Sequence, residues 1–247
     1  LADRFYGAPS KALKLVGITG TNGKTTVAFL MQAVAEAAHR RFGVIGTAGM
    51  VVGDEVLEAK SGYTTPEPHT VHRLLAAMRE RHAYGVAMEV TSHALAQQRV
   101  AHCRFDVAIF TNLTHEHLDY HKDMDSYFAA KAKLFQMLRP GAVAVINIDD
   151  PYGRRMVGVV PKGVHVLTYG FAAEALVRAE DLKLTATGAR YRIVTPVGEA
   201  EVEAPYLFGA YNAANGLAAI AAGIALGLGL EAGVAAMRTA RGAPGRF

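Results

Sequence analysis

A glycine-rich loop early in the chain carries the clearest chemical signal. Gly17-Ile-Thr-Gly-Thr-Asn-Gly-Lys-Thr-Thr26 follows a short apolar run and precedes a long segment with helical spacing of its apolar residues. In a strand–loop–helix unit, backbone N–H groups and the N-terminus of the helix point at one anion. Lys24 would add a positive charge, and Thr25 a hydroxyl group for magnesium. We therefore predict a binding loop for the phosphates of a nucleoside triphosphate.

The spacing of the glycines departs from the strict phosphate-loop pattern. Gly-x-x-x-x-Gly-Lys-Ser/Thr would place its first glycine at Ile18, whereas glycines stand at positions 17, 20 and 23. An ordinary turn that opens a helix is the alternative. The apolar run before the loop and the helical segment after it favour phosphate binding, because they supply the context that the motif requires.

A carboxylate, Glu89, lies near the end of a second apolar segment, residues 84–90, and is followed by hydroxyl side chains. A phosphate-loop enzyme needs an acid at such a strand end to hold magnesium, directly or through water. We predict this role for Glu89. The alternative is a charge that stabilises the N-terminus of a helix beginning near Thr91.

Three histidines and two carboxylates fall within the seven residues from His115 to His121. The segment nearly spells His-x-His-x-Asp-His, the dinuclear zinc signature of metallo-β-lactamase-like hydrolases, so a metallohydrolase is a rival interpretation. However, Tyr120 stands where that signature requires its last histidine. His-Glu-x-x-His is also absent, because Asp119 occupies its second histidine position. A zinc site would also leave the glycine-rich loop unexplained.

Lys131 lies on a predicted helix over residues 125–138. At i, i+4 spacing it shares a face with Tyr127 and Phe135, so it points along a partly apolar stripe. A lysine in such a place usually extends to water or pairs with a carboxylate. The residues alone favour that interpretation.

The elements that would position these residues alternate along the first part of the chain. Strands without polar alternation are expected at residues 15–18, 42–45, 84–90, 107–110 and 143–148, and helices at 25–39, 69–81 and 125–138. This alternation predicts an α/β fold with a mostly parallel sheet flanked by helices on both faces. The chemically active segments would then meet at the carboxyl ends of the strands.

The pattern changes after Asp150. Short strands with Gly and Pro turns at residues 164–169, 182–187, 191–195 and 199–203 predict a small antiparallel β appendage over about residues 164–205. A helix is expected at 211–226. Residues 1–13 and 241–247 are expected to be connectors to further domains, with residues 14–240 forming the domain itself.

The composition indicates a protein with a buried core. Hydrophobic residues make up 51% of the 247 residues, and a single cysteine, Cys103, fits a reducing cytoplasm. We expect no secretory signal and no membrane partner, because the longest uncharged apolar stretch, residues 217–230, is too short to span a bilayer. A formal charge of +4 without basic clusters argues against a nucleic-acid partner.

Six motifs occur in an order that resembles a known family. They are the loop at 17–26, Thr-Thr-Pro at 64–66, Glu-Val-Thr-Ser-His-Ala-Leu-x-x-x-Arg-Val at 89–100, Phe-Thr-Asn-Leu at 110–113, His-Leu-Asp-Tyr-His at 117–121 and Ala-Lys-x-x-Leu-Phe at 130–135. Together they resemble the central ATPase domain of the Mur ligases. Ser-His-Ala-Leu combined with Arg-Val is most similar to the MurE branch, which adds the third amino acid of the peptidoglycan stem peptide.

The resemblance implies roles in catalysis and metal binding. Lys24, Lys131 and His117 would be the catalytic residues. Thr25 and Glu89 would hold one Mg²⁺ ion and His117 a second. Lys131 would carry a carbamate, which makes it an anionic magnesium ligand and replaces the solvated lysine expected from the residues alone.

The resemblance also implies contacts with two small molecules. The ATP phosphates would be bound by Gly20, Thr21, Asn22, Gly23, Lys24, Thr25 and Thr26. The adenine would be approached by Asn212 and Asn215. The UDP-MurNAc-dipeptide would be contacted by Thr64, Thr65, Thr91, Gln97 and Arg99. Three residues depart from the family pattern, because Thr91 stands where serine is more usual, Glu116 where aspartate is usual and Tyr63 where asparagine is frequent.

The implied reaction is ATP-dependent amide-bond formation on UDP-MurNAc-L-Ala-D-Glu through an acyl phosphate, with diaminopimelate or L-lysine as the incoming amino acid. The resemblance also implies an N-terminal and a C-terminal domain, which we expect to be missing from this sequence. We therefore expect a monomeric, cytoplasmic ATP-binding core with little or no ligase activity alone. The alternatives are a folylpolyglutamate synthase-like ligase, the metallohydrolase, and an ATP-binding module without enzymatic activity.

Overall fold

The computed structural model describes residues 1–59, 62–116 and 121–243. The centre of its sheet is formed by β1 (Lys14–Thr19), β5 (Gly85–Glu89) and β6 (Val107–Phe110). β1 pairs in parallel with β5 on one side and with β6 on the other. The glycine-rich loop therefore begins between the carboxyl ends of two neighbouring strands, where ligands bind in open α/β sheets.

Parallel pairing continues outward from this centre. β2 (Phe42–Gly46) pairs with β5, β7 (Val143–Asn147) with β6, and β8 (His165–Gly170) with β7. The mostly parallel sheet expected from the sequence is confirmed.

Antiparallel strands lie at both edges of the same sheet: β3 (Gly49–Val52), β4 (Glu55–Glu58), β9 (Val177–Thr185), β10 (Gly188–Thr195) and β11 (Gly198–Ala204). The complete strand order is β11-β10-β9-β8-β7-β6-β1-β5-β2-β3-β4. The expected appendage is thus continuous with the sheet. Its first expected strand belongs to the parallel part, because β8 pairs in parallel with β7 and β9.

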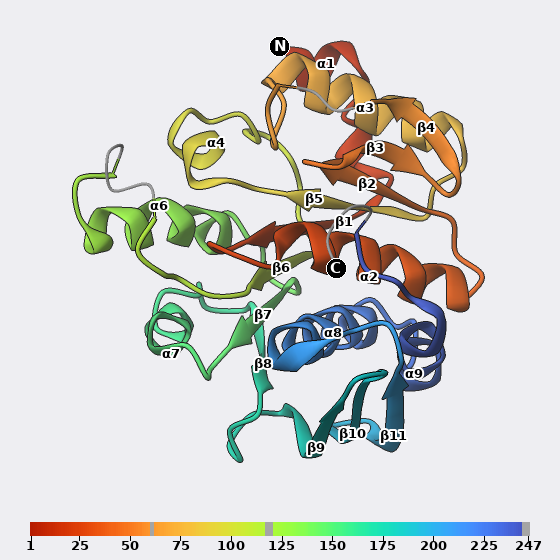
Figure 1. Cartoon of the computed structure of the whole chain (residues 1–247). Helices are drawn as coiled ribbons and strands as arrows, with labels where there is room; N and C mark the ends of the chain where they lie inside the picture. Colours follow the sequence, from red (N-terminus) through yellow and green to blue (C-terminus); the bar gives the residue numbers. More distant parts are fainter. Residues whose placement is uncertain (60–61, 117–120, 244–247) are drawn as a thin grey trace.

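Helices cover both faces of this sheet. In Figure 1 the sheet runs from β4 at the top to β11 at the bottom, with helices to its left and right. One face packs against α2 (Lys24–Ala37), α8 (Gly209–Ala225) and α9 (Leu230–Thr239).

The other face carries the side chains of α3 (Pro68–Glu80), α4 (Ser92–Ala96), α6 (Met124–Gln136) and α7 (Pro151–Val157). The chain starts with α1 (Ala2–Phe5) and a short 3-10 helix over Pro9–Lys11.

Strand β1 contributes to two separate hydrophobic cores because its side chains alternate across the sheet. Val16 and Ile18 are fully buried against α2, whereas Leu15 is fully buried in the core of the opposite face. Gly17 lies between them, where a Cβ atom would come within 2.8 Å of the ring of Phe105. Close packing on both faces fixes the strand, and with it the start of the glycine-rich loop.

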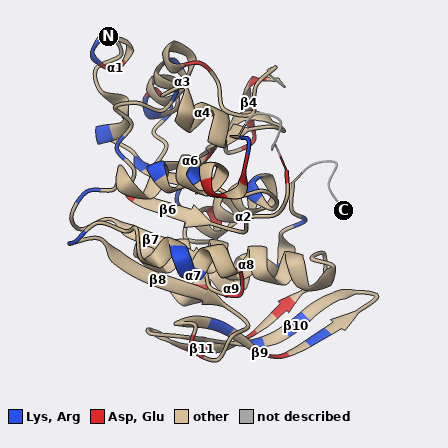
Figure 2. Cartoon of the chain, turned by 90° about the vertical axis from the view of Figure 1, so that its left-hand side faces the viewer, with Lys and Arg blue, Asp and Glu red and all other residues tan. Residues whose placement is uncertain are grey.

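Within the described residues, no helix has the length and hydrophobicity needed to cross a membrane. Lysines and arginines are distributed over many helices, strands and connections in Figure 2, and they alternate with acidic residues near β9, β10 and β11. This distribution agrees with the absence of basic clusters in the sequence.

Candidate functional site

The glycine-rich loop joins β1 to α2 and requires glycine at two positions. Gly20 has a φ of +151° and Gly23 a φ of +88°, which side chains rarely tolerate. A Cβ atom at Gly20 would lie 1.9 Å from Thr111 Oγ1, and one at Gly23 would lie 2.4 Å from Asn215 Oδ1. Since Gly23 is also the N-cap of α2 and has no capping side chain, the first N–H groups of α2 point toward the site, where they can bind an anion.

Residues that follow strand β6 hold this loop in place. Thr111 Oγ1 donates a hydrogen bond of 2.6 Å to the carbonyl oxygen of Asn22. Asn112 accepts from the Asn22 N–H at 2.9 Å through Oδ1 and from the Thr21 N–H at 2.9 Å through its carbonyl oxygen. Neither Thr111 nor Asn112 was assigned a role from the sequence. Their position directly after a strand next to β1 is the signal that could have identified them.

Two lysines meet at the start of the loop. Lys24 Nζ donates to the carbonyl oxygens of Gly20 at 2.9 Å and Thr21 at 2.8 Å. Lys131 Nζ, from the middle of α6, donates to the same Gly20 oxygen at 2.9 Å. Lys24 and Lys131, both predicted to be catalytic, therefore meet at one oxygen atom.

Lys131 is not a solvated lysine. Its side chain is 1% exposed, and Nζ lies 4.4 Å from the ring centroid of Tyr127. Burial and, to a smaller extent, the positive charge of Lys24 hold the pKa of Lys131 well below its usual value. The structure thus contradicts the expectation from periodicity alone, because α6 turns this face into the protein rather than toward water.

Glu89 is a buried carboxylate at the end of β5 that faces the first turn of α2. It is 1% exposed, and its Oε2 accepts a hydrogen bond of 3.0 Å from Thr25 Oγ1. The helix that follows is capped by Thr91 rather than by Glu89, because Thr91 Oγ1 accepts from the Ala94 N–H at 3.2 Å. The alternative role of Glu89 as a helix-terminal charge is therefore not the one that the structure shows.

Thr47 is a further residue of the site that was not identified from the sequence. It follows β2, and its N–H donates to Glu89 Oε1 at 2.8 Å while its Oγ1 donates to Glu89 Oε2 at 3.3 Å. The same hydroxyl lies 3.1 Å from Thr64 Oγ1. Thr47 thus orients the Glu89 carboxylate and connects it to a residue predicted to contact the substrate.

Thr65 and Thr91 form a hydrogen-bond network with the backbone of Glu89. Thr65 Oγ1 donates to the Glu89 carbonyl oxygen at 2.9 Å and accepts from the Thr91 N–H at 3.1 Å. The two threonine hydroxyls are 3.3 Å apart. This network ties the Thr-Thr-Pro segment to the end of β5, although the two are far apart in the sequence.

Arg99 is 7% exposed and has partners for each part of its guanidinium group. Nη1 donates to the Thr65 carbonyl oxygen at 2.9 Å, Nε donates to Gln97 Oε1 at 2.9 Å, and Nη2 forms an ion pair of 3.2 Å with Glu67. Its carbon Cζ also lies 4.3 Å from the ring centroid of Tyr63. The guanidinium group is therefore held in one orientation before any substrate binds.

Two cavities adjoin the loop. The first, which we call the Arg99 cavity, has a volume of about 620 Å³ and contains all five residues predicted to contact the substrate. It is lined by Thr21, Asn22, Gly23, Lys24, Thr25, Thr47, Gly62, Tyr63, Thr64, Thr65, Glu89, Thr91, His93, Gln97, Arg99 and Glu116.

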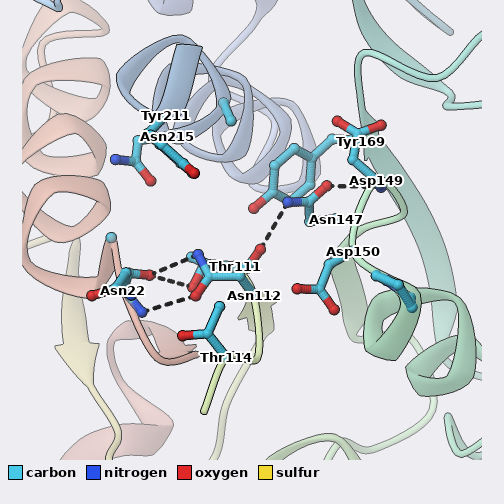
Figure 3. Close-up of a pocket in the computed structure, with 13 residues that line it drawn as sticks. Asn22, Thr111, Asn112, Thr114, Asn147, Asp149, Asp150, Tyr169, Tyr211 and Asn215 are labelled. Atoms are coloured by element: carbon cyan, nitrogen blue, oxygen red, sulfur yellow. Dashed lines mark hydrogen bonds between the residues drawn. The ribbon is translucent and has the colours of Figure 1, made fainter. Parts of the chain in front are cut away.

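The second, the Asn215 cavity, has a volume of about 490 Å³ and is drawn in Figure 3. It is lined by Asn22, Gly23, Thr111, Asn112, Thr114, Asn147, Asp149, Asp150, Pro151, Tyr169, Tyr211, Ala214 and Asn215. Asn22 and Gly23 line both cavities. The glycine-rich loop is therefore a wall that the two cavities share.

The two asparagines predicted to approach adenine have different places. Asn215 is 9% exposed and lines the Asn215 cavity. Asn212 lies outside that lining; its Oδ1 accepts from Asn215 Nδ2 at 3.2 Å, and its Nδ2 donates to the Phe208 carbonyl oxygen at 3.0 Å. Asn212 orients Asn215 from the first turn of α8. Thr26, which was predicted to bind phosphate, lies on α2 outside both linings.

The histidine-rich segment is described only in part, since His117 lies outside the described residues. His121 Nε2 is 2.8 Å from Ser92 Oγ, and its ring stacks on Tyr127 with centroids 5.0 Å apart. Among the described residues, no group of three or more His, Cys, Asp or Glu side chains could hold a metal ion. His121 packs between α4 and α6.

Comparisons with known proteins support one family. The profile described as Mur ligase middle domain matches residues 18–223. Two relatives are named UDP-N-acetylmuramoyl-L-alanyl-D-glutamate–2,6-diaminopimelate ligase. The protein from Geobacter metallireducens is 46% identical over 94% of this chain, and the one from Gloeobacter violaceus is 47% identical over 100% of it. The chain spans 45% and 49% of their lengths, which is about half.

Solved structures agree with this result. A structure with the same ligase name has a TM-score of 0.88 at 31% identity and covers 99% of this chain and 51% of its own. A folylpolyglutamate synthase from Mycobacterium tuberculosis, complexed with ADP and AMPPCP, has a TM-score of 0.76 at 18% identity, covering 96% of this chain and 61% of its own. At that identity the likeness establishes the fold alone.

Proposed function

The chain belongs to the Mur ligase family, and we propose that it is the ATP-binding core of a ligase that adds diaminopimelate to UDP-MurNAc-L-Ala-D-Glu. The observation that supports this proposal is that the glycine-rich loop lines two cavities. Asn22 and Gly23 line both the Asn215 cavity and the Arg99 cavity, so a phosphate chain bound at the loop would adjoin both. The amino acid is inferred from the names of the relatives, since its pocket belongs to another part of such ligases.

The reaction starts from two negatively charged partners. ATP occupies the Asn215 cavity with its phosphates on the loop, and the D-glutamate γ-carboxylate of the dipeptide enters the Arg99 cavity. The carboxylate oxygen attacks the γ-phosphorus, ADP leaves, and an acyl phosphate remains. The amine of the incoming amino acid then attacks the acyl carbon; it loses a proton as phosphate leaves, and the amide bond forms.

The residues of this chain counter the repulsion between carboxylate and phosphate. Lys24 carries its ammonium group at the loop, where it hydrogen-bonds Gly20 and Thr21. The N–H groups at the start of α2 add partial positive charge. In phosphoryl transfer such positioning and electrostatic stabilisation supply most of the catalysis.

The residues at the end of β5 fit a magnesium ion. Glu89 is a buried carboxylate next to the Thr25 hydroxyl, and Mg²⁺ prefers oxygen ligands of this kind. We infer that Glu89 and Thr25 hold one ion and that His117 holds a second. When bound, magnesium neutralises charge on the phosphoryl group. Thr47 keeps the Glu89 carboxylate pointed toward this place.

Lys131 fits the carbamate that the family carries. Its lowered pKa favours the neutral amine, and only a neutral amine reacts with carbon dioxide. In that reaction an N–C bond forms and a proton leaves, so that the side chain becomes an anion. The negative charge would lie close to Lys24, because both side chains reach Gly20.

We infer that Arg99 positions the acceptor rather than the nucleotide. It lines the Arg99 cavity, and Gln97 and Glu67 fix its orientation. Thr64 and Thr65 lie on the same side of the loop and supply hydroxyl groups. The complete enzyme would work as a monomer in the cytoplasm, with its other domains binding the uridine nucleotide and the amino acid.

Phosphate release by the complete protein tests the proposal. With ATP, UDP-MurNAc-L-Ala-D-Glu and diaminopimelate, we expect release that stops when the dipeptide substrate is omitted. L-Lysine in place of diaminopimelate should support little release. Release that instead depends on a folate and L-glutamate would support the folylpolyglutamate synthase alternative and contradict the proposal. Hydrolysis that requires tightly bound zinc and no ATP would favour the metallohydrolase.

A further inference from the structure

Tyr211 is an aromatic side chain that remains 87% exposed although it lines the Asn215 cavity. It lies in the first turn of α8, four residues before Asn215, so the two side chains share one face of the helix. Figure 3 shows Tyr211 extending from α8 toward the cavity. Its ring therefore presents a large apolar surface beside the Asn215 cavity.

Other exposed tyrosines have partners for their rings. Tyr63 lies against Arg99, and Tyr206 lies against Arg241 with 4.9 Å from Cζ to the ring centroid. In the described parts of the chain, the ring of Tyr211 has no such aromatic or cationic partner. Exposing the apolar face of an aromatic ring to water is unfavourable in free energy, and a ligand that stacks on the ring would remove this cost.

We propose that Tyr211 stacks on the face of the nucleobase and thereby positions the nucleotide. This inference rests on the proposed function, because it takes the nucleoside to lie in the Asn215 cavity. The opposite walls carry polar groups, including Asn112, Asn147 and Asp149. These groups can meet the edge of a base but offer no aromatic face beside it. The Tyr169 ring is buried, and its hydroxyl donates to the Phe110 carbonyl oxygen at 3.2 Å.

Stacking makes a specific prediction about ligands. Every base has an aromatic face, so loss of the Tyr211 ring should weaken the binding of ATP and the binding of GTP by the same factor. Inorganic triphosphate has no base, and its binding should not change. Since stacking on an aromatic side chain contributes about 5- to 100-fold in affinity per base, a Tyr211→Ala variant should bind ATP that much more weakly.

The test is calorimetric titration of the complete protein with a non-hydrolysable ATP analogue, its GTP counterpart and inorganic triphosphate, each with magnesium. Tyr211→Phe keeps the ring and should keep the affinity. Tyr206→Ala removes an exposed tyrosine outside the cavity and serves as the matched control. Far-UV circular dichroism checks that each variant is folded, which the exposure of Tyr211 leads us to expect.

The outcomes separate the inference from the proposed function. Equal ATP affinity in wild type and Tyr211→Ala would overturn the inference and leave the function intact. An equal loss for triphosphate, or a loss in Tyr211→Phe as large as in Tyr211→Ala, would also overturn it. If wild type binds neither ATP nor triphosphate, the proposed function itself fails.

Discussion

Lys24 and Lys131 donate hydrogen bonds to the same acceptor, the carbonyl oxygen of Gly20, each at 2.9 Å. They come from different helices and are 107 positions apart in the sequence. Two positive charges so close together would repel, so this geometry favours a neutral Lys131. The shared acceptor thus favours the neutral, reactive amine of Lys131 in the unliganded protein. It also connects the glycine-rich loop to α6.

Replacing Lys131 with methionine should stabilise the protein while removing ligase activity. Between its lowered pKa and its ordinary value of 10.5, Lys131 binds a proton in the unfolded chain but not in the folded one. The stability of the wild type therefore rises with pH over this interval. The Lys131→Met variant lacks this dependence, so its advantage should be largest at and below the lowered pKa and should shrink as the pH rises toward the ordinary lysine value of 10.5.

Urea unfolding at several pH values, in buffer free of carbon dioxide, measures this difference. We expect an advantage of at least about 1 kcal/mol near neutral pH, or roughly 2–4 °C in Tm for a chain of this size. Lys133→Met is the matched control, because Lys133 is exposed on the same helix. A difference between wild type and Lys131→Met that does not vary with pH would contradict a neutral, buried Lys131.

Replacing Lys24 with alanine should abolish ATP turnover and preserve the fold. The variant loses the one side-chain cation of the glycine-rich loop, and removal of a single preorganised donor typically lowers kcat by about 10²- to 10³-fold. Phosphate release by the complete protein measures the loss, with circular dichroism as the check on folding. Retained dipeptide-dependent release at the wild-type rate would rule out the role assigned to Lys24.

Replacing Thr47 with valine should weaken magnesium binding and leave the fold unchanged. In a Thr47→Val variant the backbone hydrogen bond from Thr47 to Glu89 is kept, but the hydroxyl contacts with Glu89 and Thr64 are lost. We expect the magnesium concentration for half-maximal activity to rise by about 10-fold, within the range for residues that orient metal ligands. Thr47→Ser keeps the hydroxyl and should behave like wild type. An unchanged magnesium requirement in Thr47→Val would show that the hydroxyl does not orient Glu89.

Much of the fold could be predicted because the buried parallel strands have uninterrupted apolar sequences. The segments at 107–110 and 143–148 correspond closely to β6 and β7. The hairpin formed by β3 and β4 was missed, because Gly49 to Glu58 is short and partly exposed. The segment 164–169 was assigned to an antiparallel unit, since periodicity identifies a strand but not the strand with which it pairs.

The residues of the candidate site could likewise be predicted only in part. Lys24, Thr25 and Glu89 could be identified as candidates because each stands at a strand end or in a loop with recognisable chemistry. Lys131 could not be understood from spacing, since its burial depends on how α6 packs against the loop. Thr47 could not be recognised from the sequence, because its role consists of contacts with Glu89 that only the folded chain creates. Asn112 follows a predicted strand, but its contact with Asn22 likewise exists only in the folded chain.

The transfer of oxygen from substrate to phosphate tests the central claim most directly. The complete protein is supplied with ATP, diaminopimelate and UDP-MurNAc-L-Ala-D-Glu in which both oxygens of the γ-carboxylate are ¹⁸O, and the released phosphate is analysed by mass spectrometry. An acyl phosphate formed across the loop leaves one carboxylate oxygen on phosphorus, so we predict one ¹⁸O atom in each phosphate. Amide formation with phosphate that contains no ¹⁸O would contradict phosphoryl transfer from the Asn215 cavity to a carboxylate in the Arg99 cavity.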